Sequence, residues 1–195
     1  MYFILIMAIT DNFDQGVRYE KSWQEPAEAL YEKLGFTNIR RFDFDAGGIS
    51  KDLQLKDIDL ELKGHTTITV SEKFRSRDFG DIMLELEKNY NGTVKHNGWA
   101  VQSGADYLFY VTPKNLYIIP ERKVKEAVED ISKNLESYNI PTQATVRPTK
   151  FKDHTFFVSN NNRGNSNWKN LNVVLTPKVF GITKRRTIDG INIWW

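Results

Sequence analysis

The sequence predicts a single α/β domain in which a mixed β-sheet is flanked by helices. Its 195 residues are 40% hydrophobic, which is enough for one core of ordinary size but short for two full domains. Two segments show the apolar spacing of amphipathic helices, and between them lie six short apolar or alternating runs separated by turn residues. A helix, a series of strands and a second helix together indicate an α/β fold.

The first predicted helix begins at Ser22 and ends at Gly35. Ser22 and Glu25 have the spacing of a capping box, and Gly35 is a typical helix stop. The apolar residues of this segment recur at helical spacing: Trp23, Ala27, Leu30, Tyr31 and Leu34. The segment is therefore predicted to be an amphipathic helix.

The next part of the chain predicts strands of one mixed sheet. The expected strands are 38–44, 58–62, 66–74, 82–86, 107–112 and 116–119. Pro120 then opens a second helix, which we expect to pack against the sheet. Its apolar stripe consists of Val124, Ala127, Val128, Ile131 and Leu135.

The composition changes near Tyr138, which suggests a core of residues 1–137 and a basic, β-rich extension of residues 138–195 packed on it. Residues 150–195 contain eight Lys or Arg against two Asp, a net charge of +6, which leaves −4 on the rest of the chain. A basic tail on an acidic body suits a surface that faces polyanions, although a solvated lysine-rich surface is the alternative. The candidate phosphate contacts are Arg163, Lys169, Lys178, Lys184, Arg185 and Arg186.

Composition also excludes several classes of site. The chain has no cysteine, so it has neither a disulfide framework nor a thiolate ligand, which fits a reducing cytoplasm. Its three histidines lack the spacing of a zinc site, and no phosphate-binding glycine loop is present. The apolar run of residues 1–9 follows no basic residue and is far shorter than the ~20 residues that span a bilayer, so we expect a buried strand there.

The residues that carry chemistry lie between Asp57 and Lys88. Asp57 and Asp59 share one face of their segment, because side chains alternate along a strand. In the next strand the same alternation places Ser71, Lys73 and Arg75 on one face, and Val70, Glu72 and Phe74 on the other. Carboxylates and a lysine on neighbouring strands form a site that can hold a divalent metal against a phosphate.

This pattern resembles the PD-(D/E)xK nuclease superfamily. The core motif of that superfamily is an Asp at the start of one strand and, after a short hairpin, an acid-x-Lys on the next; here Asp59, a turn at Gly64 and then Glu72 and Lys73 follow that order. Residues 98–110 look like the later strand region of phage-type members. The resemblance covers about residues 20–135 and implies a restriction-endonuclease-like fold, with a mixed central sheet flanked by helices.

One position departs from the motif, because the residue two places before Lys73 is Ser71 rather than an acid. The resemblance implies that another carboxylate replaces it, and we expect Glu85 on the next strand to do so, with Glu72 as the formal motif acid. A carboxylate of the first helix, Glu25 or Glu28, could add a ligand. The expected catalytic residues are Asp59, Glu72, Lys73 and Glu85, and the expected metal ligands among them are Asp59, Glu72 and Glu85.

The resemblance implies a metal-dependent DNA endonuclease that uses Mg²⁺ or Mn²⁺. Lys73 would position the attacking water, and Arg75 or Arg77 would contact the scissile phosphate. A duplex cutter with one site per chain implies a homodimer, located in the host cytoplasm if the protein is encoded by a phage. Two alternatives remain open: a catalytically inactive nuclease-like module that binds DNA or protein, which Ser71 favours, and a structural or inhibitory protein with an incidental acidic edge.

Overall fold

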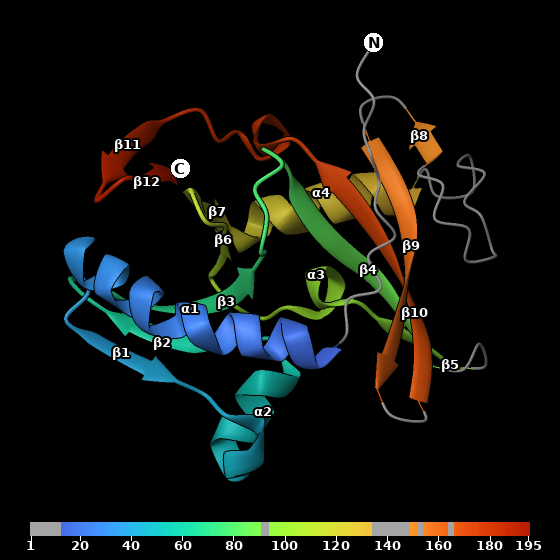
Figure 1. Ribbon diagram of the computed structural model, residues 1–195, viewed down its shortest axis with the longest axis horizontal. Coiled ribbons are helices and arrows are strands. Elements are labelled where there is room, and N and C mark those ends of the chain that lie inside the picture. The colour runs from blue at the N-terminus through green and yellow to red at the C-terminus, as the bar shows by residue number, and fades with distance from the viewer. Residues whose placement is uncertain (1–12, 91–93, 134–148, 152–153, 164–165) are drawn as a thin grey trace.

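The fold consists of two β-sheets with helices packed on them (Figure 1). It is seen in a computed structural model that describes residues 13–90, 94–133, 149–151, 154–163 and 166–195. The helices are α1 (Phe13–Lys33), α2 (Gly48–Leu55), α3 (Trp99–Gln102) and α4 (Glu121–Lys133), with 3₁₀ turns at Phe44–Ala46 and Pro177–Phe180.

The first sheet is mixed and has seven described strands. Its central pair, β3 and β6, is parallel, β12 is parallel to β7, and the other neighbours are antiparallel. The strand order is β1 (Asn38–Arg41), β2 (Leu60–Lys63), β3 (Thr67–Phe74), β6 (Tyr107–Val111), β7 (Asn115–Pro120), β12 (Ile191–Trp194) and β11 (Arg185–Ile188).

The second sheet is antiparallel and has five described strands. Their order is β5 (Val94–Asn97), β4 (Ile82–Tyr90), β10 (Ser166–Leu175), β9 (His154–Arg163) and β8 (Thr149–Phe151). The sequence predicted one sheet, and this was wrong for β4. β6 takes the free edge of β3, so β4 leaves the first sheet and pairs with β5 and β10 instead.

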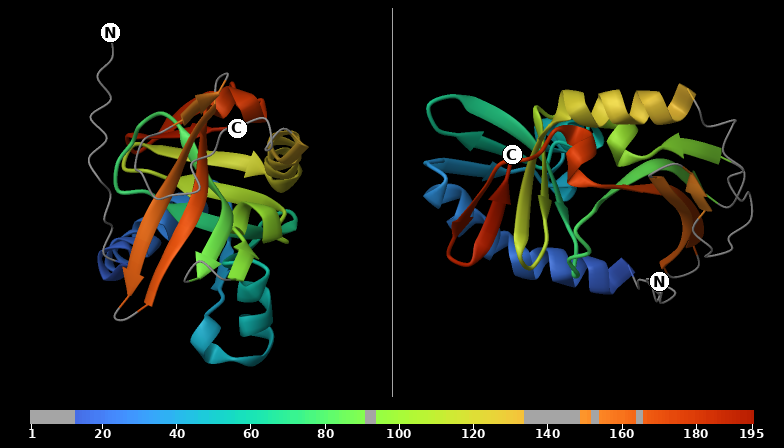
Figure 2. Two further views of the ribbon diagram at one scale, coloured as in Figure 1. Left: turned by 90° about the vertical axis from the view of Figure 1, so that its right-hand side faces the viewer. Right: turned by 90° about the horizontal axis from the view of Figure 1, so that it is seen from above.

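Two hydrophobic cores lie on opposite faces of the seven-stranded sheet. α1 covers one face through Ala27, Leu30 and Tyr31, which pack on the side chains of β2, β3 and β6. α4 and the second sheet cover the other face, where Val124 and Ile131 belong to the same core as strands β4 and β10. Figure 2 shows α1 and α4 on the two sides of the sheet, so the predicted packing of the second helix is confirmed.

The predicted end of the first helix is confirmed, but its predicted start is not. That helix begins at Phe13, and the hydroxyl of Ser22 donates to the carbonyl of Tyr19 in the helix interior, so Ser22 is not its N-cap. The predicted stop is confirmed, because the helix ends at Lys33 and Gly35 follows with a φ of 100°.

The C-terminal residues are built into both sheets. Strands β8, β9 and β10 belong to the five-stranded sheet, and β11 and β12 extend the seven-stranded one. Ile193 is buried in the α1 core, whereas Trp195 is 43% exposed. The strand predicted for residues 1–9 lies outside the described residues. Within the described ranges, no helix is both long and apolar enough to cross a membrane.

Candidate functional site

The two acidic residues predicted to form a pair lie where the chain enters β2. Asp57 follows α2 and has a φ of 55°, a left-handed conformation that Asp tolerates better than most residues. Asp59 immediately precedes β2, and its backbone N–H donates to the carbonyl of Val70 at 2.8 Å. Because this bond continues the pairing of β2 with β3, both carboxylates are held beside the middle of β3.

Lys73 joins the two carboxylates. Its Nζ lies 2.8 Å from Asp57 Oδ1 and 3.1 Å from Asp59 Oδ2, and the three side chains are between 12% and 22% exposed. Gln54 of α2 donates to the other oxygen of Asp59 at 3.0 Å, and the backbone N–H of Glu72 donates to Oδ2 at 2.6 Å. The pair therefore already holds one cation in a largely desolvated place.

Ser71 connects the position of the missing motif acid to Asp57. Its side chain is fully buried, and its hydroxyl donates to Asp57 Oδ2 at 2.5 Å. Ser71 and Lys73 thus reach the same carboxylate from one face of β3, as the alternation predicted. The acid next to position 71 is supplied by Asp57.

Glu72 points to the opposite face of β3, toward α1. It is 5% exposed and accepts hydrogen bonds of 2.5 Å from the hydroxyl of Tyr31 and from Nη1 of Arg41. Nε of Arg41 pairs with Glu28, so the predicted helix carboxylate is occupied there. Glu72 therefore ties α1 and β1 to β3 instead of meeting the carboxylates of Asp57 and Asp59.

Glu85 approaches the same site from β4. Asn170 of β10 donates to one of its oxygens, and the backbone N–H of Trp99 also bonds to its carboxyl group. Burial raises the pKa of Glu85, and the charges of Lys73 and Asp57 act on it in opposite directions. Glu85 is thus a third carboxylate within electrostatic range of the pair, held in place by the second sheet.

Sequence reasoning missed two residues beside Lys73. The indole ring of Trp99 lies 5.5 Å from Nζ of Lys73, a cation–π arrangement. Glu20 of α1 is solvent-accessible, yet the surrounding protein desolvates its carboxyl group enough to raise its pKa, and Asp59 raises it further. Glu20 stands three residues before Trp23 and seven before Ala27, which places it on the apolar face if the first helix is extended toward the N-terminus. An acid on that face was the feature of the sequence that could have identified Glu20 as a site residue.

The charges of the site depend on one another. Burial alone would lower the pKa of Lys73, but Asp59 and Asp57 outweigh it and raise that pKa, so the ammonium stays charged. Burial raises the pKa of Asp57, and Lys73 only partly offsets this. The cluster is therefore one positive charge stabilised by two close carboxylates.

The basic residues predicted to contact phosphate differ in their exposure and in whether another side chain already engages them. Arg75 is engaged, because its guanidinium pairs with Asp81 and lies 4.6 Å from the ring of Phe79, whereas Arg77 is exposed. Arg185 lies 5.3 Å from the ring of Trp194. Lys169, Lys178, Lys184, Arg185 and Arg186 are exposed, and the side chain of Arg163 lies outside the described residues. The basic strand β11 is four strands away from β3 in the sheet, so it is not part of the carboxylate cluster.

The carboxylates of this site meet only part of the coordination that a hard divalent cation requires. Within the described ranges, no group of three or more His, Cys, Asp or Glu is arranged to hold a metal ion. Mg²⁺ commonly takes one or two protein carboxylates and completes its shell with waters and substrate phosphate, and Asp57 and Asp59 offer that number. No family model matches the chain, and no curated protein and no solved structure matches it significantly.

Proposed function

We propose that this chain is a metal-dependent DNA endonuclease of the restriction-endonuclease-like fold. The observation that carries the proposal is the cluster of Asp57 and Asp59, which lie just before β2, with Lys73 of the adjacent strand β3. The arrangement of the first sheet supports it. α1 precedes three antiparallel strands, β1, β2 and β3, with α2 between the first two, and β6 follows α3 and lies parallel to β3. The strands between β3 and α3, which are β4 and β5, belong to the second sheet.

In this proposal Asp57 and Asp59 would hold Mg²⁺ or Mn²⁺, with Glu85 and Glu20 adding negative charge nearby. The bound ion would supply charge neutralisation at the scissile phosphate and an activated water. Lys73 keeps its proton and orients the water and a phosphate oxygen through its ammonium group. Trp99 shields one side of that ammonium from solvent.

Glu72 has a supporting role in this proposal. Its carboxylate holds Arg41 and Tyr31, which fixes β3 against α1 and thereby fixes the position of Lys73. A cutter of duplex DNA with one such centre per chain would act as a homodimer. The basic residues of β11 would contact phosphates away from the centre.

The experiment that tests the proposal is cleavage of supercoiled plasmid and of a branched DNA in Mg²⁺, Mn²⁺ or EDTA. Wild type should cut only with metal, and Lys73→Ala and Asp59→Ala should both lose the activity. Lys133→Ala is the matched control, since Lys133 is an exposed lysine at the end of α4, and it should cut like wild type. Cutting in EDTA, or full activity in Lys73→Ala, would contradict the proposal.

A second candidate is a nuclease-like module that binds DNA or protein without cutting. The observation that favours it is that Lys73 already forms ion pairs with both carboxylates while Ser71 stands in the position of an acid. Binding of DNA without cleavage in any metal would support this candidate over the enzyme.

A further inference from the structure

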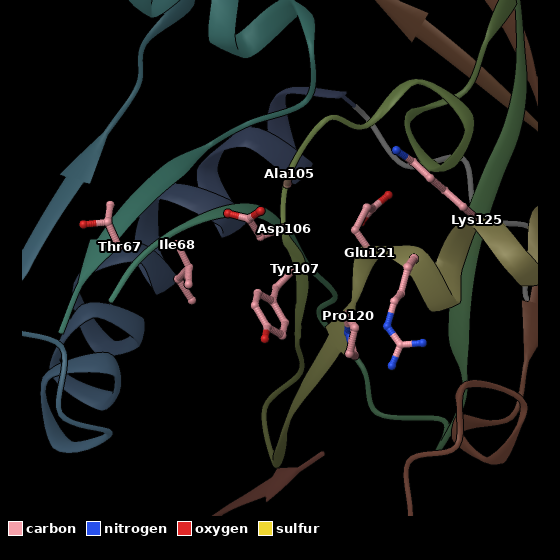
Figure 3. Close-up of a pocket in the computed structure, with 9 residues that line it drawn as sticks. Thr67, Ile68, Ala105, Asp106, Tyr107, Pro120, Glu121 and Lys125 are labelled. Carbon is pink, nitrogen blue, oxygen red and sulfur yellow. The ribbon is translucent and has the colours of Figure 1, made fainter. Parts of the chain in front are cut away.

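A pocket of about 500 Å³ opens at the edge of the sheet where β3 and β6 begin and α4 follows β7 (Figure 3). Its size is that of a small-molecule site. It lies beyond the carboxylate cluster, at the start of β3 rather than at Ser71 and Lys73. The pocket is lined by Thr67, Ile68, Ala105, Asp106, Tyr107, Pro120, Glu121, Arg122 and Lys125.

Glu121 is the unusual residue of this pocket. It is 3% exposed, and neither carboxyl oxygen has a hydrogen-bond partner among the described residues. The nearby hydroxyl of Ser103 favours the charged form, but it does not reach hydrogen-bonding geometry with the carboxyl group. A buried acceptor that lacks a donor destabilises the fold, so a ligand that donates hydrogen bonds here would satisfy it.

The outer wall of the pocket is basic. Arg122 and Lys125 are exposed on the first turns of α4, where the helix N-terminus adds partial positive charge. Figure 3 shows the side chains of Glu121 and Lys125 extending from α4 in the same direction. Arg122 lies 3.7 Å from Glu126, an exposed pair that a stronger anion can displace.

The other acid of the pocket is already engaged. One oxygen of Asp106 accepts hydrogen bonds from the backbone N–H and the hydroxyl of Thr69, each at 2.8 Å. Glu121 is therefore the free acceptor, and the ring of Tyr107 and the side chain of Ile68 offer a partly buried apolar wall. The ligand that fits has hydrogen-bond donors for Glu121, a flat apolar part for Tyr107 and Ile68, and an anionic group for the basic side chains of α4.

We propose that this pocket binds a guanosine monophosphate unit, either free or at the end of a nucleic-acid strand. Guanine presents two adjacent N–H donors that match the two oxygens of Glu121, and Lys125 and Arg122 hold the phosphate. The choice of a nucleotide rests on the proposed nuclease function, because that activity would generate strand ends.

The test is calorimetric titration of the metal-free protein with GMP, AMP, guanosine and inorganic phosphate. We expect saturable binding of GMP that is tighter than that of AMP or phosphate. Glu121→Gln should weaken GMP binding about tenfold, because the amide keeps only one acceptor and no charge. Lys125→Ala should weaken the binding of GMP but not that of guanosine.

Asp59→Ala separates this inference from the proposed function, because the charges that act on Glu121 are those of Asp57, Lys125 and Lys73. That variant should bind GMP like wild type even where it no longer cuts DNA, so the two proposals can fail independently. Competition by an oligonucleotide with a 5′-terminal phosphoguanosine would assign the pocket to strand ends, and a lack of competition would assign it to the free nucleotide. No saturable binding of GMP, equal binding by Glu121→Gln, or equal affinity for phosphate alone would overturn the proposal.

Discussion

Lys73 and Asp57 form an ion pair of 2.8 Å that links the C-terminal end of β3 to the turn after α2. The pair is only partly exposed, and Asp57 is held in turn by the hydroxyl of Ser71. A cation between two carboxylates is the arrangement that a divalent metal would also use. Lysine and metal are therefore expected to compete for, or share, the same oxygens.

Replacing Lys73 by methionine tests this competition. The variant keeps the apolar stem but leaves Asp57 and Asp59 without their counter-charge, so the free energy of unfolding should fall by about 2 kcal/mol in EDTA. Mg²⁺ stabilises a protein when it binds only the folded state. It should stabilise Lys73→Met more than wild type, because in the variant no lysine competes for the oxygens of Asp57 and Asp59. Urea denaturation with EDTA or Mg²⁺ measures both effects. Lys133→Met serves as the control, and an equal response of both variants to Mg²⁺ would count against a metal at this pair.

The two acids that flank Ser71 should behave differently when neutralised. Asp57→Asn removes a carboxylate that contacts Lys73 and should abolish metal-dependent cleavage in the proposed nuclease. Glu72→Gln leaves Arg41 and Tyr31 with a weaker acceptor and should lower the free energy of unfolding by about 1–3 kcal/mol. Cleavage by Glu72→Gln should persist. Plasmid cleavage and urea denaturation of both variants measure this, and the reverse pattern would make Glu72 the metal ligand.

The parts of the site that sequence could predict are local. Alternation along β3 correctly separated Ser71 and Lys73 from Glu72, because that period holds in any strand. The hairpin turn at Gly64 likewise brought Asp59 beside Lys73, since β2 and β3 follow one another in the chain.

The parts that could not be predicted depend on distant pairing. Glu85 is held by Asn170, a partner 85 residues away, and only the pairing of β4 with β10 brings the two together. Asp57 reaches Ser71 through a left-handed turn that no periodicity reveals. Glu20 lies on α1 and Glu121 on α4, and the positions of these helices over the sheet depend on how the two cores pack. Their surroundings could therefore not be predicted from local sequence.

Glu121 should make the stability of the fold depend on pH. Burial raises its pKa from the ordinary 4.5 to about 7, although Ser103, Lys125 and Lys73 favour the charged form and Asp57 opposes it. The folded state therefore holds this proton over a pH range in which the unfolded chain has released it. Stability from this group is present below about pH 4.5 and is lost as the pH rises to about 7, by an amount on the order of 3 kcal/mol.

Urea denaturation between pH 4.5 and 8 measures this dependence. Glu121→Gln should lose the fall in stability over that range, because glutamine does not titrate. Glu25→Gln, which changes an exposed carboxylate of α1, is the control. A fall of equal size in Glu121→Gln would show that other groups cause it.

Gly98 should be the least replaceable glycine near the site. Its backbone has a φ of −69° and a ψ of 166°, which alanine adopts freely, so any effect of a methyl group is steric. A Cβ there would clash with the carbonyl oxygen of Glu85 and lie 2.8 Å from the carbonyl carbon of Leu86, both backbone atoms of β4. Gly98→Ala should therefore push α3 away from β4 and lower the free energy of unfolding by more than about 2 kcal/mol.

Gly104→Ala is the matched control for this prediction. A Cβ at Gly104 would meet its nearest neighbour, Cβ of Lys56, at 3.5 Å, an ordinary van der Waals contact, so stability should change little. Because Gly98 precedes Trp99, whose N–H holds Glu85 and whose ring covers Lys73, Gly98→Ala should also change the site. Thermal and urea denaturation of the two variants measure the first effect, and metal-dependent cleavage measures the second. Equal stability of Gly98→Ala and Gly104→Ala would mean that the backbone of β4 shifts at little cost to make room for the methyl group. Trp99 would then not be rigidly held over Lys73.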